Sequence, residues 1–201
     1  GSVLITEGSG RALAASPQQA PSFDVPNPVY IPVNGPFLGA TADLQNSGLP
    51  SLAKLGWKDG TLNIILNKGN RQFAKTSVIP VGDPGTQRPD GTIDVDVADV
   101  ALGDVTGDGN VDAAYLNSHH NEAKILVGAS GGTFLTTPLA VESNGPGGGI
   151  VMGDFIGDGF GHLMMSENQS GWPDLHIIYN DGKNNFTFHH DAPILPGNNY
   201  M

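Results

Sequence analysis

The chain of 201 residues contains no cysteine, and this absence removes several kinds of site at once. Without thiols the chain has no disulfide bridge, no thiolate metal ligand and no cysteine nucleophile. The absence does not settle the cellular compartment. It does mean that an interaction other than disulfide bonding must fix the loops.

Positive charge is also scarce, with 9 Lys and Arg residues against 20 Asp and Glu residues and a net charge of −11. No basic cluster offsets this charge locally, so the chain would repel a phosphate backbone, and nucleic-acid binding is excluded. Small cations are the more natural partners. No apolar run approaches the roughly 18 residues of a membrane-spanning helix, which excludes membrane insertion by that route.

Residues that favour turns are abundant. The chain holds 29 Gly and 15 Pro, about a fifth of its length, while charged residues make up 14% and apolar residues 38%. These proportions are typical of a folded globular chain with many tight turns and few long helices. The composition therefore favours an all-β fold.

The sequence repeats itself. Three segments align without gaps, and each consists of an apolar strand, a turn containing Gly, and a Phe; they are residues 62–73, 123–134 and 175–186. Residues 3–13 form a weaker fourth copy. A repeat of about 40–60 residues indicates a propeller or a solenoid.

A second shared block precedes each of the three full copies. It begins at Asp43, Asp104 and Asp154. From this Asp to the closing Phe the spacing is 30 residues in the first copy (43 to 73), 30 in the second (104 to 134) and 32 in the third (154 to 186). The near-constant spacing indicates three structurally equivalent repeats.

Each repeat is expected to hold four strands. In the middle copy the apolar patterns bounded by turns predict strands over residues 93–105, 112–117, 123–128 and 133–141. Four antiparallel strands per repeat predict a propeller blade, which buries its faces by stacking on neighbouring blades. A β-sandwich is the alternative, but it does not require one loop motif to recur in every repeat.

An acidic loop in the middle copy has the spacing of a calcium site. Asp104, Thr106, Asp108 and Asp112 stand at positions 1, 3, 5 and 9, and the carbonyl of Asn110 is available at position 7. Calcium takes six to eight oxygen ligands, which a tightly turned loop supplies from alternate residues. The alternative is that Asp-Gly and Asn-rich segments simply make good β-turns.

The other two loops carry fewer suitable ligands. In the third copy Asp154 and Asp158 remain, while Ile156 and His162 occupy positions 3 and 9, so the calcium motif is only partial. The first copy keeps only Asp43 at an acidic position, and we expect hydrogen bonds but no cation there.

The middle repeat resembles the FG-GAP or VCBS-type repeats of integrin α-chain propellers and of many secreted bacterial and fungal proteins. The resemblance rests on Ala-Leu-Gly-Asp-Val-Thr-Gly-Asp-Gly-Asn-Val-Asp at residues 101–112, followed by an Ile-Leu-Val strand and Gly-Gly-Thr-Phe at 131–134, and it covers roughly residues 36–190. It implies a β-propeller, usually of seven blades, with structural Ca²⁺ in the loop between the first and second strands. Extracellular calcium modules are often weak binders suited to a millimolar-calcium exterior, so the expected location is secreted or at the cell surface.

This resemblance divides the chain into about three and a half blades. The expected parts are an outer hairpin of a preceding blade at 1–20, a blade with a degenerate loop at 36–90, a blade with the calcium loop at 91–142, a blade with a partial calcium loop at 143–195, and the start of a further blade at 196–201. A ring needs at least four blades. We therefore expect further blades, either from a longer form of this chain or from another chain.

Ligands of such propellers commonly bind on the face opposite the calcium loops. There the loops between second and third strands carry an aromatic and polar set: Trp57, Asp59, His119, His120 and Trp172. An aromatic ring stacked on a sugar, with polar neighbours bonding its hydroxyls, is one interpretation; a Trp packed beneath its own loop is the other. Adjacent histidines in a strand point to opposite faces, so His119 and His120 do not readily chelate one ion.

The sequence leaves two functional hypotheses. The first is a non-catalytic binding or scaffolding module for a glycan or a protein. The second is a polysaccharide-active enzyme of lyase or dehydratase type, in which His119 and His120 would be the acid and base candidates. No esterase, metalloprotease or phosphate-loop motif occurs, and we assign no catalytic residue.

Overall fold

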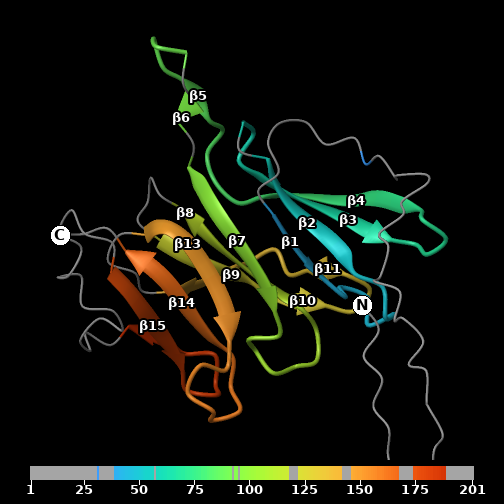
Figure 1. The fold of residues 1–201 in the computed structure, drawn as a ribbon, viewed down its shortest axis with the longest axis vertical. Helices are drawn as coiled ribbons and strands as arrows, with labels where there is room; N and C mark the ends of the chain where they lie inside the picture. Colours follow the sequence, from blue (N-terminus) through green and yellow to red (C-terminus); the bar gives the residue numbers. More distant parts are fainter. Residues whose placement is uncertain are drawn as a thin grey trace, which may run out of the picture. The chain divides into compact units, whose positions relative to one another are not determined.

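The regular structure of the described residues consists of β-strands. The computed structural model describes residues 31, 39–56, 58–91, 93–94, 96–117, 122–141, 146–167 and 174–188. Every regular element in these residues is a strand, which confirms the all-β class (Figure 1). Across the same residues, nothing helical has the length and hydropathy needed to cross a membrane. The expected parts at 1–20 and 196–201 lie outside the described residues.

Three four-stranded antiparallel sheets form the body of the structure. The first sheet has the order β1-β2-β3-β4, with β1 Gly39–Ala42, β2 Ser51–Gly56, β3 Thr61–Asn67 and β4 Phe73–Pro80. The middle sheet has the order β12-β9-β8-β7, with β7 Val97–Gly103, β8 Asp112–Asn117, β9 Glu122–Leu126 and β12 Leu139–Val141. The third sheet has the order β13-β14-β15-β16, with β13 Pro146–Gly153, β14 His162–Glu167, β15 Asp174–Asn180 and β16 Phe186–Phe188.

Two short ribbons complete the described strands. They are β5 Thr86–Gln87 paired with β6 Ile93–Asp94, and β10 Gly128–Ala129 paired with β11 Thr133–Phe134. These ribbons correct three strand predictions, because 93–105, 123–128 and 133–141 are each divided between two elements. By contrast, the strand predicted at 112–117 is confirmed as β8 without a shift.

The middle sheet is buried on both faces. All six residues of β8 are buried. Ala113 and Tyr115 join a core shared with Leu55 and Ile64 of the first sheet. Because successive strand residues point to opposite faces, Ala114 and Leu116 pack in a second core with Leu163 and other residues of the third sheet. The three sheets therefore stack face to face.

The first strand of the middle sheet lies between its counterparts in the other two sheets. Strand β7 contacts β1 on one side and β13 on the other (Figure 1). Asp99 on β7 accepts a hydrogen bond from the backbone N–H of Ile150 on β13, with 3.0 Å between Oδ2 and N. This arrangement brings the loops after the three first strands to the same edge of the stack.

Candidate cation-binding loops

The three loops that join first to second strands share one backbone conformation. We number each from 1 to 9: the first loop is residues 43–51, the second 104–112 and the third 154–162. Positions 4 and 6 of every loop have positive φ, namely Asn46 (52°) and Gly48 (77°), Gly107 (75°) and Gly109 (84°), and Gly157 (76°) and Gly159 (87°). Gly and Asn tolerate this left-handed region best, so these residue types permit the shared loop shape.

The Asp at position 1 ties each loop together. In the second loop Asp104 Oδ1 accepts from the backbone N–H of Gly107 at 2.7 Å and of Asp108 at 3.2 Å, and Oδ2 accepts from Gly109 N–H at 2.8 Å. Asp154 repeats this pattern in the third loop. Asp43 likewise accepts from two loop N–H groups in the first. The protein's own hydrogen bonds thus fix the loop shape.

In the first and third loops these bonds also favour the ionised carboxylate of the Asp at position 1. The N–H of Ser47, foremost among several donors, lowers the pKa of Asp43 below its usual value. The N–H of Gly159 lowers the pKa of Asp154 in the same way.

Position 9 holds a buried hydrogen-bond acceptor in all three loops. Ser51, Asp112 and His162 are each 0% exposed. Each accepts a backbone N–H at or just after the end of the third strand of its sheet: Asn67 N–H to Ser51 Oγ at 3.1 Å, Gly128 N–H to Asp112 Oδ1 at 2.7 Å, and Asn180 N–H to His162 Nδ1 at 3.1 Å. The residue at position 9 therefore fastens the loop to the sheet. The spacing predicts a cation ligand at this position of the second loop, although Ser, Asp and His all share the capacity to accept a hydrogen bond.

Asp112 makes the most extensive contacts of the three. Its Oδ2 accepts from the N–H groups of Val105 and Thr106, both at 2.9 Å, in addition to the bond from Gly128 to Oδ1. Burial raises the pKa of Asp112, while these three N–H donors oppose the rise. Both carboxylate oxygens are therefore engaged with backbone.

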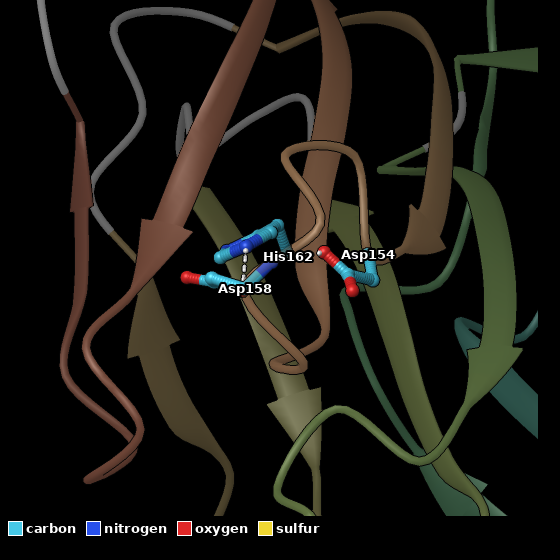
Figure 2. Close-up of side chains that lie close together, drawn as sticks. All are labelled: Asp154, Asp158 and His162. Atoms are coloured by element: carbon cyan, nitrogen blue, oxygen red, sulfur yellow. Dashed lines mark hydrogen bonds and ion pairs between the residues drawn. The ribbon is translucent and has the colours of Figure 1, made fainter.

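Of the acidic and histidine side chains that the structure describes, one group brings three ligand atoms within 4.8 Å of one another. It consists of Asp154, Asp158 and His162 in the third loop (Figure 2). The equivalent residues Asp104, Asp108 and Asp112 of the second loop do not form such a group.

Hydrogen bonding argues against His162 as a metal ligand. Its Nδ1 accepts from Asn180 N–H, so in the neutral ring the proton is on Nε2. Nε2 lies 3.0 Å from Asp158 Oδ1 and donates to it, as Figure 2 shows. A nitrogen that carries its proton has no free lone pair for a cation. The third loop is therefore a hydrogen-bonded cluster with two carboxylates and no third ligand from His162.

The second loop fits a hard cation better than the third. Asp104 and Asp108 are both exposed. Asp108 uses Oδ1 to accept from Asn110 N–H at 2.8 Å, and among the described residues no hydrogen bond to its Oδ2 is observed. Thr106 Oγ1 is shielded from solvent and lies near the Asp112 carboxylate, but it makes no hydrogen bond of good geometry within the described residues. Oxygen donors at positions 1, 3 and 5, with the Asn110 carbonyl nearby, are the type that Ca²⁺ prefers.

Only part of the predicted ligand-binding set can be placed. Asp59 is exposed in the turn between β2 and β3, where it accepts from Thr61 Oγ1 at 2.7 Å. Trp57, His119, His120 and Trp172 lie outside the described residues. Asp59 sits at the end of its sheet opposite the first loop, because the first-to-second and second-to-third connections of an antiparallel sheet alternate between its two ends.

Replacing Ser51 with alanine should lower the free energy of unfolding by about 1–2 kcal/mol, because the partly buried N–H of Asn67 loses its acceptor. Urea denaturation measures this. Ser47→Ala is the matched control: this exposed hydroxyl of the same loop bonds Asp43, and its loss should cost less than about 0.5 kcal/mol. Equal costs for the two variants would contradict the fastening role of position 9.

No protein-family model matches the chain, and comparison with the curated proteins finds no match.

Proposed function

We propose that this chain is a calcium-stabilised binding module built from blades of the FG-GAP or VCBS propeller type. Three observations support this proposal. Each described four-stranded sheet runs in simple antiparallel order, the first strands of adjacent sheets contact one another, and the same loop recurs after each first strand. Stacked blades of a propeller have these features.

The observation that carries the calcium assignment is the second loop. Asp104 and Asp108 place two exposed carboxylates in one tight turn, next to the buried Thr106 hydroxyl. Ca²⁺ bound there would neutralise the two carboxylates and stiffen the edge of the stack in a chain without disulfides. The other two loops would rely chiefly on their hydrogen bonds.

Binding is assigned to the opposite edge of the sheets, where the connections between second and third strands carry Asp59 and, by sequence, Trp57 and Trp172. Tryptophan offers a sugar ring a flat apolar surface, and nearby polar groups bond its hydroxyls. A glycan or a protein carrying one is therefore the proposed ligand. The module would be non-catalytic and extracellular.

A glycan array probed with and without a chelator tests this proposal. We expect retention of an intact sugar in millimolar Ca²⁺, weaker retention after chelation, and at least about a tenfold loss of affinity in Trp172→Ala. Leu135→Ala is the matched control, since this exposed side chain follows β11, away from the proposed ligand edge. Chemical conversion of the bound sugar would contradict the non-catalytic assignment, and undiminished binding by Trp172→Ala would contradict the assigned edge.

A further inference from the structure

One peptide group of the second loop is held from both of its sides. This group joins Val105 to Thr106, the residues at positions 2 and 3. Its N–H, which belongs to Thr106, donates to Asp112 Oδ2 at 2.9 Å. Its carbonyl oxygen, which belongs to Val105, accepts from Nδ2 of Asn180 at 2.8 Å. Because the C=O and N–H of a planar trans peptide point in opposite directions, the two bonds together fix the orientation of this peptide.

The second of these bonds comes from the neighbouring sheet. Asn180 is the last residue of β15 in the third sheet, and it is buried. Its Oδ1 accepts from Gly182 N–H at 3.0 Å, which leaves Nδ2 as the end of the amide that faces Val105. The backbone N–H of Asn180 also donates to His162 Nδ1, the buried acceptor of the third loop. One residue therefore fastens both the second and the third loop to the third sheet.

A close approach of the third loop to the second loop lies beside this bond. A Cβ atom added at Gly161, position 8 of the third loop, would lie 2.8 Å from Val105 Cα and 3.1 Å from the Asp104 carbonyl oxygen. Position 8 holds the larger residues Pro50 and Val111 in the other two loops. The absence of a side chain at Gly161 therefore lets the third loop rest directly on the start of the second.

The equivalent asparagine of the first sheet bonds within its own repeat. Asn67 is the last residue of β3, and its Oδ1 accepts from Gly69 N–H at 2.9 Å, just as Asn180 Oδ1 accepts two residues further on. Its Nδ2, however, donates to the Pro50 carbonyl of the first loop at 3.0 Å. The middle sheet has Gly128 at this place, with no amide side chain to give. The second loop thus takes this donor from the next repeat.

We propose that Asn180 and Gly161 are positioning residues of the second-loop cation site, so that Ca²⁺ binding there depends on the docking of the third sheet. This inference rests on the proposed calcium site and names what regulates it. Thr106 begins at the clamped peptide, and Asp104 precedes that peptide by one residue, so its orientation sets where both candidate ligands project. By linkage the effect is reciprocal, and bound Ca²⁺ strengthens the docking of the third sheet on the second loop.

Calorimetric titration of Ca²⁺ into chelator-treated protein measures this dependence. In Asn180→Ala we expect the dissociation constant to rise at least about fivefold, because the second loop loses its donor from the third sheet. Asn67→Ala is the matched control, since it loses the same two kinds of amide hydrogen bond within its own repeat. Its dissociation constant should stay within about twofold of that of the unaltered chain. Unchanged affinity in Asn180→Ala, or equal weakening by both variants, overturns the proposal.

Gly161→Ala tests the close approach in the same titration. Its added methyl group must displace the backbone of Asp104 and Val105, so the dissociation constant should again rise at least about fivefold. Gly149→Ala is the control, because a Cβ there meets no atom closer than 3.8 Å. Asn180→Ser covers the possibility that Asn180→Ala does not fold: its hydroxyl can still accept from Gly182 N–H but ends one bond short of Val105. Wild-type affinity in Gly161→Ala and Asn180→Ser would refute the positioning role.

Hydrogen exchange of the Thr106 amide in a chelator tests the clamp without any cation. Exchange should become at least about fivefold faster in Asn180→Ala than in Asn67→Ala, whereas a general loss of stability would speed it equally in both. Binding of Ca²⁺ by the unaltered chain together with equal exchange in the two variants overturns this inference alone. Absence of saturable Ca²⁺ binding by the unaltered chain overturns the calcium site, and this inference with it.

Discussion

Replacing Asp112 with alanine is expected to lower the free energy of unfolding by about 3 kcal/mol or more. Three backbone N–H groups would lose their acceptor, those of Val105 and Gly128 in buried positions and that of Thr106 in a partly buried one, and each buried loss costs about 1–3 kcal/mol. Because a whole domain is stable by only about 5–15 kcal/mol, a large share of its stability is at risk. Urea denaturation in a chelator measures the effect without any contribution from a cation.

Asp108→Ala is the matched control for this experiment. Asp108 belongs to the same loop, is exposed, and accepts only from Asn110 among the hydrogen bonds observed. In the chelator its loss should cost less than about 1 kcal/mol. A small and equal cost for both variants would show that Asp112 does not fasten the loop to the sheet.

Calcium is expected to raise the melting temperature of the chain by about 3–10 °C at about 10 mM. This range follows from dissociation constants of about 0.1–1 mM for extracellular calcium modules, which give about 1.4–2.7 kcal/mol at that concentration, and from about 2–4 °C per kcal/mol for a chain of this size. Differential scanning calorimetry before and after adding chelator measures the shift.

Asp108→Asn should abolish most of this shift. The amide oxygen can still accept from Asn110 N–H, so the substitution removes the charge while sparing the loop. Asp59→Asn changes the same charge at the opposite end of a sheet and should retain the full shift. Loss of the shift in both variants would mean that calcium acts on overall charge and not on the second loop.

The all-β class and strand β8 could be predicted from the sequence because short apolar runs are bounded there by strong turn residues. The prediction of one strand over 93–105 was wrong for a tertiary reason. Asp96 continues the alternating pattern, yet it is fully buried, and its carboxylate accepts from Asp83 N–H at 2.7 Å. Strand 133–141 is interrupted at Pro138, which has no N–H to contribute to a sheet.

The loops show a different limit of prediction from the sequence. Spacing places oxygen atoms along a loop, but it does not say whether a carboxylate faces solvent or the sheet behind it. Asp104 and Asp108 are exposed, whereas Asp112 is buried and accepts from the N–H of Gly128, a residue 16 positions further along the chain. One sequence signal could have revealed the buried acceptor. The residues at position 9 of the three repeats, Ser51, Asp112 and His162, can all accept a hydrogen bond.

The central claim is that hydrogen bonds hold the shape of all three loops and that the second loop, in addition, binds a calcium ion. Calorimetric titration of Ca²⁺ into chelator-treated protein tests it most directly. The claim predicts saturable binding with a dissociation constant of about 0.1–1 mM that disappears in Asp108→Asn. Absence of saturable binding up to about 10 mM, or binding that survives in Asp108→Asn, would contradict it.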